Sequence, residues 1–230
     1  MEDNEAKILE SWQLNAENWI QTITNSEIES RQLVTNQAII TALEKQLSNK
    51  EMRVIDIGCG EGWLLRHLAT QAMTNLFGVD AIPELIEKAK EKVPQAQFAV
   101  CTYQEISEGK LSFQNFDLAV CNFCLLGKES TEALFQFLPY LLKKNGKVLI
   151  QTLHPQMITQ ETSGWIEGSW VGMKRDFQMP YNWYFRTLED WLALFSKANL
   201  TLLETVAPLH PNTHQPASII FASKISMKSD

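Results

Sequence analysis

The stretch Val54-Ile55-Asp56-Ile57-Gly58-Cys59-Gly60-Glu61-Gly62 decides the fold of this chain. Its apolar first half predicts a short buried strand, and its glycines predict a tight turn that opens a helix over residues 62–72. Such a turn lets the backbone approach a ligand closely and directs the free N–H groups of the helix toward it. The stretch therefore predicts a ligand site at the carboxyl end of a strand in an α/β sheet.

The charges around this turn indicate the class of ligand. The glycines follow the spacing G-x-G-x-G rather than the G-x-G-x-x-G of dinucleotide sites, and the turn contains no Lys or Arg. Asp56 and Glu61 would repel a pyrophosphate and would complement a cation. Asp80 ends the next predicted strand, where a carboxylate can accept two hydrogen bonds from a ribose diol. A ribose, a positive charge and no phosphate together indicate S-adenosylmethionine as the cofactor.

Strands and helices alternate along most of the chain, which predicts parallel pairing with right-handed crossovers. Two late strands, over residues 200–206 and 218–223, have no helix between them and are expected to pair antiparallel. We therefore predict an α/β fold with a doubly wound, mostly parallel, seven-stranded Rossmann-like sheet whose last strand is antiparallel. The other expected strands are 52–57, 76–80, 97–101, 116–122 and 147–153, and the expected helices after the glycine turn are 62–72, 83–93, 129–143 and 187–198.

Four segments resemble the class I S-adenosylmethionine-dependent methyltransferases, most closely the small-molecule group that includes ubiquinone-biosynthesis enzymes. They are the glycine turn, GVDAIPELIEKAK over residues 78–90, FDLAVCNFCLL over 116–126 and LLKKNGKVLIQT over 141–152. The resemblance implies transfer of a methyl group to a small-molecule acceptor by in-line displacement. It also implies a Rossmann-like methyltransferase domain over residues 49–230, and we expect residues 1–48 to form a cover of two helices in front of it.

The resemblance also implies which residues of this chain contact the cofactor, because they occupy the positions that bind it in the family. It implies that Gly58 and Gly60 contact the methionine moiety through their backbone and that Asp80 binds the ribose hydroxyls. Where the family often has an acid that bonds the adenine, this chain has Thr102 and Tyr103, which are expected to hold the adenine through backbone or ring contacts. The other expected cofactor residues are Asp56 beside the glycine turn, Ala81 and Ile82 beside the adenine, Asn122 and Phe123 at the methionine end, and Arg31 on the cofactor carboxylate, where a surface arginine is the alternative.

Residues 154–186 form a long aromatic-rich insert, which we expect to act as a substrate lid because long connections in compact α/β domains commonly bind ligands. A hairpin that packs its own rings is the alternative. His154 follows the fifth strand and is the expected general base, with a loop-capping role as the alternative. His210 and His214 are weaker candidates for the base, and His67 is expected to be structural. The expected substrate-binding residues are Trp165, Arg175, Tyr181, Trp183 and Tyr184.

The amino-acid composition limits the classes of partner that this protein is expected to bind. The 230 residues have a formal net charge of -7, which disfavours nucleic acid. The four cysteines lie in apolar surroundings and fit free thiols of a cytoplasmic protein, and no set of residues predicts a metal site. We expect no signal peptide and no membrane span. A non-catalytic partner subunit and, less favoured, an NAD-dependent oxidoreductase are the alternatives, and the sequence predicts no particular oligomeric state.

Overall fold

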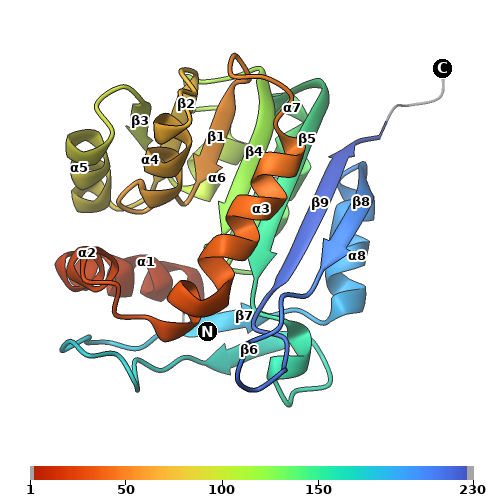
Figure 1. Cartoon of the computed structure of the whole chain (residues 1–230). Coiled ribbons are helices and arrows are strands. Elements are labelled where there is room, and N and C mark those ends of the chain that lie inside the picture. The colour runs from red at the N-terminus through yellow and green to blue at the C-terminus, as the bar shows by residue number, and fades with distance from the viewer. Residues whose placement is uncertain (1–2, 227–230) are drawn as a thin grey trace.

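A seven-stranded sheet forms the centre of the computed structural model, which describes residues 3–226 (Figure 1). Its strand order is β3-β2-β1-β4-β5-β9-β8, and β9 alone runs in the direction opposite to the other strands of this sheet. The predicted doubly wound, mostly parallel sheet with an antiparallel last strand is therefore confirmed. The strands are β1 Val54–Ile57, β2 Leu76–Asp80, β3 Gln97–Val100, β4 Phe116–Asn122, β5 Leu142–Thr152, β8 Leu200–Val206 and β9 Ile219–Ile225.

Helices cover both faces of the sheet, so the central strands are apolar on both sides. In β1, Val54 packs with Leu64 of α4 and Leu43 of α3, whereas Ile55 belongs to a second core cluster with Phe135 of α7. This alternation follows from the two-residue period of a strand. The helices flanking the sheet are α3 Asn36–Gln46, α4 Trp63–Thr70, α5 Pro83–Lys92, α6 Tyr103–Ser107, α7 Glu129–Leu141 and α8 Leu188–Lys197.

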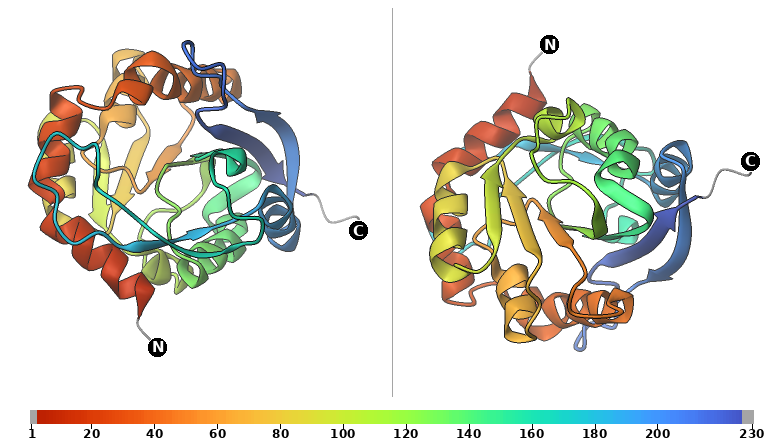
Figure 2. Two further views of the ribbon diagram at one scale, coloured as in Figure 1. Left: turned by 90° about the horizontal axis from the view of Figure 1, so that it is seen from below. Right: turned by 90° about the horizontal axis from the view of Figure 1, so that it is seen from above.

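The N-terminal helices differ from the expected pair. Residues 4–48 contain three α-helices, α1 Asn4–Leu14, α2 Ala16–Thr24 and α3, together with a π-helical turn, Arg31–Thr35, that leads directly into α3. Helices α1 and α2 lie across the carboxyl ends of the strands, whereas α3 lies against a face of the sheet (Figures 1 and 2). Helix α3 is part of the core, because Ile39 and Leu43 are fully buried in the same cluster as Val54 of β1. Of these three helices, only α1 and α2 cover the end of the sheet.

Two other local features differ from the expectation. The helix expected over residues 129–143 ends at Leu141, and β5 begins at the next residue and not at 147, so that Asn145 and Gly146 lie inside the strand. Helix α6 was not predicted. It begins after Thr102, whose hydroxyl accepts the N–H of Glu105 while the Glu105 carboxylate accepts the N–H of Thr102. This capping box is a local signal for a helix start that the sequence contained.

The insert forms a small hairpin of its own, β6 Gly164–Glu167 paired antiparallel with β7 Asn182–Phe185, after a single 3-10 turn at Pro155–Met157. Together with α1 and α2, it surrounds the carboxyl end of the sheet when the molecule is seen from below (Figure 2, left). In the described part of the chain, no helix combines the length and apolarity needed to cross a membrane.

Candidate functional site

The glycine turn and the end of β2 form the floor of the site. Gly58, Gly60 and Gly62 all have positive φ, which favours glycine. The Gly58 N–H donates to the Val79 carbonyl at 2.8 Å, and the Gly60 N–H donates to Oδ2 of Asp80 at 2.8 Å. The N–H of Ile82 donates to Oδ1 of the same carboxylate at 3.0 Å. Asp80 is therefore held by backbone at the carboxyl end of the sheet before any ligand arrives.

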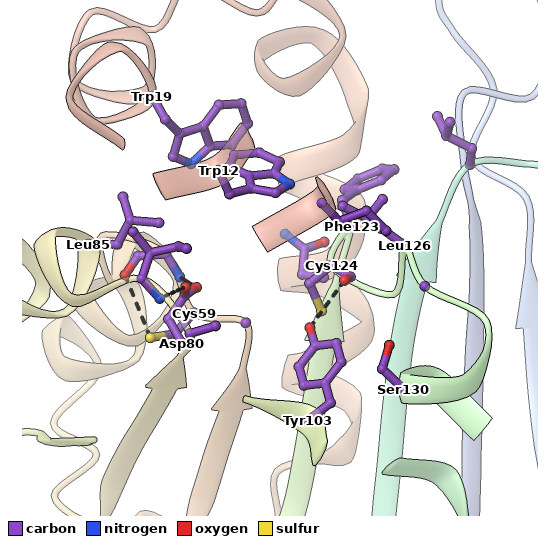
Figure 3. Close-up of a pocket in the computed structure, with 18 of the residues that line it drawn as sticks. Trp12, Trp19, Cys59, Asp80, Leu85, Tyr103, Phe123, Cys124, Leu126 and Ser130 are labelled. Atoms are coloured by element: carbon purple, nitrogen blue, oxygen red, sulfur yellow. Dashed lines mark hydrogen bonds between the residues drawn. The ribbon is translucent and has the colours of Figure 1, made fainter. Parts of the chain in front are cut away.

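A cavity of about 1180 Å³ opens above this floor. In Figure 3, Asp80 and Tyr103 lie below the cavity, Trp12 and Trp19 lie above it, and Phe123 and Leu126 lie at its side. The volume exceeds what a single drug-sized ligand needs, so the cavity has room for a nucleoside-sized molecule and a second small molecule. Cavity residues from outside the floor include Glu5, Ile8, Arg31, Thr35, Tyr103, Gln104, Asn122, Phe123, Cys124, Ser130, Leu153, His210 and Gln215.

Carboxylates dominate the electrostatics beside the glycine turn. Asp56 is 2% exposed, and burial, followed by repulsion from Asp80 and Glu61, raises its pKa to about 7. Burial also raises the pKa of Asp80, although the N–H groups of Ile82 and Gly60 oppose this shift. Glu61 pairs with Lys92 at 2.9 Å and with Arg66 at 3.2 Å. The site therefore favours a ligand that brings positive charge.

The buried oxygens at this end of the sheet that have no hydrogen-bond partner among the described residues include Oδ1 of Asp56, Oε1 of Glu61, Oδ1 of Asn122 and Oε1 of Gln151. Buried polar atoms are normally satisfied, so unpartnered acceptors at a cavity point to a missing donor. Glu61 and Asn122 both line the cavity. A ligand with N–H or O–H donors and a positive charge would satisfy them.

The roof of the site is aromatic. The rings of Trp12 and Trp19 meet edge to face, with centroids 5.1 Å apart. The guanidinium of Arg31 lies 5.8 Å from the ring of Trp19 and 4.9 Å from that of Trp63, and its Nε donates to Asn36 Oδ1 at 3.1 Å. Burial lowers the pKa of Arg31 to about 10, with Glu61 opposing the shift, so the side chain keeps its charge at neutral pH. The π-helical turn places this cation in the cavity wall, in keeping with the frequent occurrence of such turns at functional sites.

The structure brings most of the expected cofactor residues together. Asp56 is the exception, because it lies behind the glycine turn and does not line the cavity. Thr102 caps α6 with its side chain, and the hydroxyl of Tyr103 donates to the Cys124 carbonyl at 3.1 Å. The expected residues that line the cavity are Arg31, Gly58, Gly60, Asp80, Ala81, Ile82, Thr102, Tyr103, Asn122 and Phe123.

His154 has a different position from the one expected of a general base. Its side chain is buried, and Nδ1 accepts the N–H of Gln156 at 3.2 Å, which caps the following 3-10 turn. A neutral ring that accepts through Nδ1 carries its proton on Nε2 and has no free lone pair for a substrate. Burial also lowers its pKa. His154 is absent from the cavity wall, whereas His210 of the β8–β9 connection lines it.

The expected substrate residues separate into two groups. Tyr181, Trp183 and Tyr184 line a second cavity beside the first. Trp165 packs on the ring of Tyr184 at 5.5 Å, and it lines neither of these two cavities. Arg175 also lies outside both, because its guanidinium forms two hydrogen bonds to the Glu27 carboxylate at 2.8 and 2.9 Å.

Sequence reasoning missed several cavity residues. Cys124 was expected only to be a free thiol in apolar surroundings, but it is half-buried in the cavity wall and its Sγ donates to the Ile57 carbonyl at 3.0 Å. Glu5 and Ser130 were not considered. Glu5 of α1 accepts the backbone N–H of Lys128 at 2.7 Å and the hydroxyl of Ser130 at 2.6 Å, so it caps α7 from across the cavity. No local pattern pairs residues more than 120 positions apart, so these contacts needed the tertiary structure.

Comparison with known families identifies the architecture. Residues 29–205 match the family model of a methyltransferase domain. The chain belongs to this methyltransferase family. The expected class I methyltransferase fold is thereby confirmed, and the matched segment includes the glycine turn, Asp80 and Asn122.

Two curated methyltransferases illustrate the relationship. The chain is 33% identical over 108 residues to a malonyl-acyl-carrier-protein O-methyltransferase of Halalkalibacterium halodurans, covering 44% of this chain and 39% of that one. It is 28% identical over 120 residues to a ubiquinone biosynthesis O-methyltransferase of Coxiella burnetii, covering 52% and 51%. The chain thus spans about half the length or less of these methyltransferases.

A solved methyltransferase shares the fold over most of its length. The 1,6-didemethyltoxoflavin-N1-methyltransferase of Burkholderia thailandensis, solved with 1,6-didemethyltoxoflavin and S-adenosylhomocysteine bound, superimposes with a TM-score of 0.66. The identity is 15%, and the match covers 92% of this chain and 87% of that one. At this identity the likeness concerns the methyltransferase fold.

Proposed function

We propose that this chain transfers a methyl group from S-adenosylmethionine to a small-molecule acceptor. The observation that carries the proposal is the Asp80 carboxylate, which two backbone N–H groups fix at the rim of a cavity of about 1180 Å³. Each of its oxygens accepts only one of these hydrogen bonds, so both retain capacity for a ribose diol. Membership of the methyltransferase family supports this choice of ligand over a dinucleotide.

The donor set fits this cofactor. Its ammonium and sulfonium groups match the unpartnered oxygens of Glu61 and Asn122, and its carboxylate matches the guanidinium of Arg31. The aromatic faces of Trp12 and Trp19 favour a cation in the space above the floor. Ala81, Ile82, Thr102 and Tyr103 would hold the adenine, because they line the adjoining wall.

When bound, the cofactor supplies a methyl carbon attached to a good leaving group. The chain's own contribution is then alignment for in-line displacement and exclusion of water. Asn122 and Phe123 come from the end of β4 and border the space left for the acceptor, while α1 and α2 close it from above. The proposal includes no general base, because an acceptor atom that is already deprotonated at neutral pH needs none.

The expected partners follow from the same features. The formal net charge of -7 and the carboxylates around the cavity favour a small molecule over nucleic acid. Cys59, Cys101, Cys121 and Cys124 are all free thiols, which supports a reducing, cytoplasmic setting. The division into a cover over residues 1–48 and a methyltransferase domain over 49–230 stays a proposal, with the aromatic insert as a lid over the acceptor.

Calorimetry with S-adenosylhomocysteine tests the proposal. We expect wild type to bind it and to show no comparable binding of NAD. Asp80→Asn should raise the dissociation constant about 30- to 100-fold, because two charge-assisted hydrogen bonds become neutral. Asp117→Asn, at the opposite end of the sheet, is the matched control and should bind as wild type does. Equal affinity of the Asp80→Asn protein and wild type would contradict the proposed role of Asp80, and binding of NAD alone would favour an oxidoreductase.

A further inference from the structure

A second cavity of about 230 Å³ lies beneath the β6–β7 hairpin. Its walls come from four separate parts of the chain, namely the segment after β4, the segment after β5, the hairpin with its connecting loop, and the start of α8. Aromatic rings dominate these walls. They are contributed by Phe123, Trp170, Tyr181, Trp183, Tyr184, Phe185 and Trp191.

Several polar groups in these walls are satisfied within the protein. Trp170 Nε1 donates to the Gln178 carbonyl at 3.0 Å, and the Tyr184 N–H donates to the Leu126 carbonyl at 2.7 Å. Arg186 is the only charged residue among those that line this cavity, and it is 4% exposed. Its two terminal nitrogens donate to the carbonyls of Gly127 and Lys128, at 3.0 and 2.9 Å. A ligand in this cavity therefore meets mainly aromatic side chains, and the polar groups named here are already engaged.

Phe123 joins the two cavities. It lines both of them, as do Leu126 and Leu153. Its backbone has φ 54°, a left-handed conformation that an aromatic residue rarely adopts, and its N–H donates to the Gln151 carbonyl at 2.8 Å. Strained backbone of this kind persists where the surrounding structure over-determines it, most often at functional sites. The chain turns sharply after β4, and Phe123 lies in the walls of both cavities. Figure 3 shows it at the side of the main cavity.

We propose that the second cavity is the acceptor's anchoring subsite, and that it takes a neutral, apolar, ring-sized arm while Phe123 aligns the reacting atom in the main cavity. This inference rests on the proposed methyl transfer and specifies its substrate class. An aromatic-lined pocket recognises a ring and its immediate substituents through contact and stacking.

The volume of the second cavity and the charge of Arg186 both restrict which arm of an acceptor can bind there. A cavity of about 230 Å³ is smaller than the roughly 300–1,000 Å³ of pockets for drug-sized ligands, so it suits a single ring. A cationic arm would lie beside the buried Arg186 guanidinium, which already stacks on Tyr184 and Trp191 at 4.8 and 5.3 Å. Two N–H groups of that guanidinium already donate to backbone carbonyls, so an anionic arm would have to compete with these carbonyls for Arg186. The arm is therefore one neutral ring with a small substituent.

Three probes of nearly equal size test this inference: benzyl alcohol, benzylammonium and benzoate. Each is titrated by ligand-observed NMR into the full chain, with and without saturating S-adenosylhomocysteine. We expect benzyl alcohol to bind in both conditions, at least tenfold more tightly than either charged probe. Equal or tighter binding of a charged probe would overturn the assignment of a neutral arm.

A matched pair of substitutions locates the probe. Ile158 lines the second cavity and Ile28 lines the main one, and both are half-buried. Ile158→Trp should weaken benzyl alcohol binding at least tenfold, whereas Ile28→Trp should leave it within twofold of wild type. The reverse pattern would place the probe in the main cavity and overturn the inference.

Folding and cofactor binding are controlled separately. Thermal unfolding identifies a variant that does not fold, and the smaller Ile158→Phe then replaces Ile158→Trp with an expected loss of at least threefold. Titration of S-adenosylhomocysteine into the same samples distinguishes the two proposals. If S-adenosylhomocysteine fails to bind but benzyl alcohol binds, the proposed function is wrong. If S-adenosylhomocysteine binds and benzyl alcohol does not, the subsite is wrong.

Discussion

The floor and the roof of the site are built in opposite ways. The floor is the glycine turn with the end of β2, and backbone hydrogen bonds between neighbouring parallel strands fix it, such as Gly58 to Val79. The roof is α1 and α2 with the β6–β7 insert, and side chains hold it together. Asn15 exchanges two hydrogen bonds of 2.8 Å with the backbone of Gln178, and Ser11 donates to the Met179 carbonyl at 2.6 Å.

The floor is therefore expected to be rigid, whereas the roof is expected to open and close. The floor belongs to the core of the sheet, so disturbing it should lower the stability of the whole domain. The roof joins segments about 160 residues apart through a few polar contacts. Such contacts open locally at a lower free energy than the core does, as lids over active sites must. Substitutions in the two regions should therefore differ in kind as well as in size.

Gly58→Ala should have the largest effect. A Cβ at this position would lie 2.5 Å from Cys124 Cβ and 2.8 Å from Tyr103 Oη, on a backbone with φ 73°. We expect a loss of about 3–5 kcal/mol in the free energy of unfolding, measured by urea denaturation, together with loss of S-adenosylhomocysteine binding.

Gly172→Ala is the matched control for this substitution. Gly172 also has positive φ, at 91°, but a Cβ there meets nothing within 4 Å. Its cost should be the conformational strain alone, about 1 kcal/mol, and cofactor binding should persist. Similar losses for both glycines would show that the floor is not tightly packed at Gly58.

Asp56→Asn should change how the free energy of unfolding depends on pH. Because burial raises the Asp56 pKa to about 7, the folded chain binds a proton that the unfolded chain has released between about pH 4 and 7. Stability therefore falls as the pH rises toward 7, by about 2 kcal/mol between pH 5.5 and 7.5 from this group. The asparagine removes this term, so the stability of the variant relative to wild type should increase by that amount over the same interval. A difference in unfolding free energy that does not change with pH would contradict the raised pKa.

Asn15→Ala should have the smallest effect on global stability, about 1 kcal/mol. Its larger consequence should be local, with faster amide hydrogen exchange at residues 176–179 and little change in β1 and β4. Asn18→Ala removes one exposed contact to the Asp176 carbonyl and is the milder control. Equal acceleration of exchange in the sheet would show that roof and floor open together.

The fold and the floor were largely predictable from the sequence. The period of the strands, the glycine spacing and Asp80 are local signals, and the structure places the expected glycines and Asp80 in one cavity wall. Helix boundaries were less predictable, since Asn145-Gly146 resembles a helix stop but lies within β5. The β5 pairing with β4 and β9 decides that segment, and pairing partners lie far away along the chain.

The roles of single side chains were decided by tertiary contacts. Arg175 looked like a substrate ligand, yet Glu27 engages its guanidinium 148 residues away. His154 stood at the right end of β5, yet the neighbouring Gln156 N–H occupies its Nδ1. The orientation of a polar side chain depends on which hydrogen-bond partners the fold places beside it. Residue type and spacing in the sequence do not specify those partners.

The sequence by itself determined the sheet, the glycine turn and the carboxylate at the end of β2, because backbone geometry and short-range spacing specify them. The tertiary structure alone decided the roof, the unpartnered oxygens and the second cavity. The roof and the second cavity arise where α1, the end of β4 and the β6–β7 insert meet, and only packing brings such distant segments together.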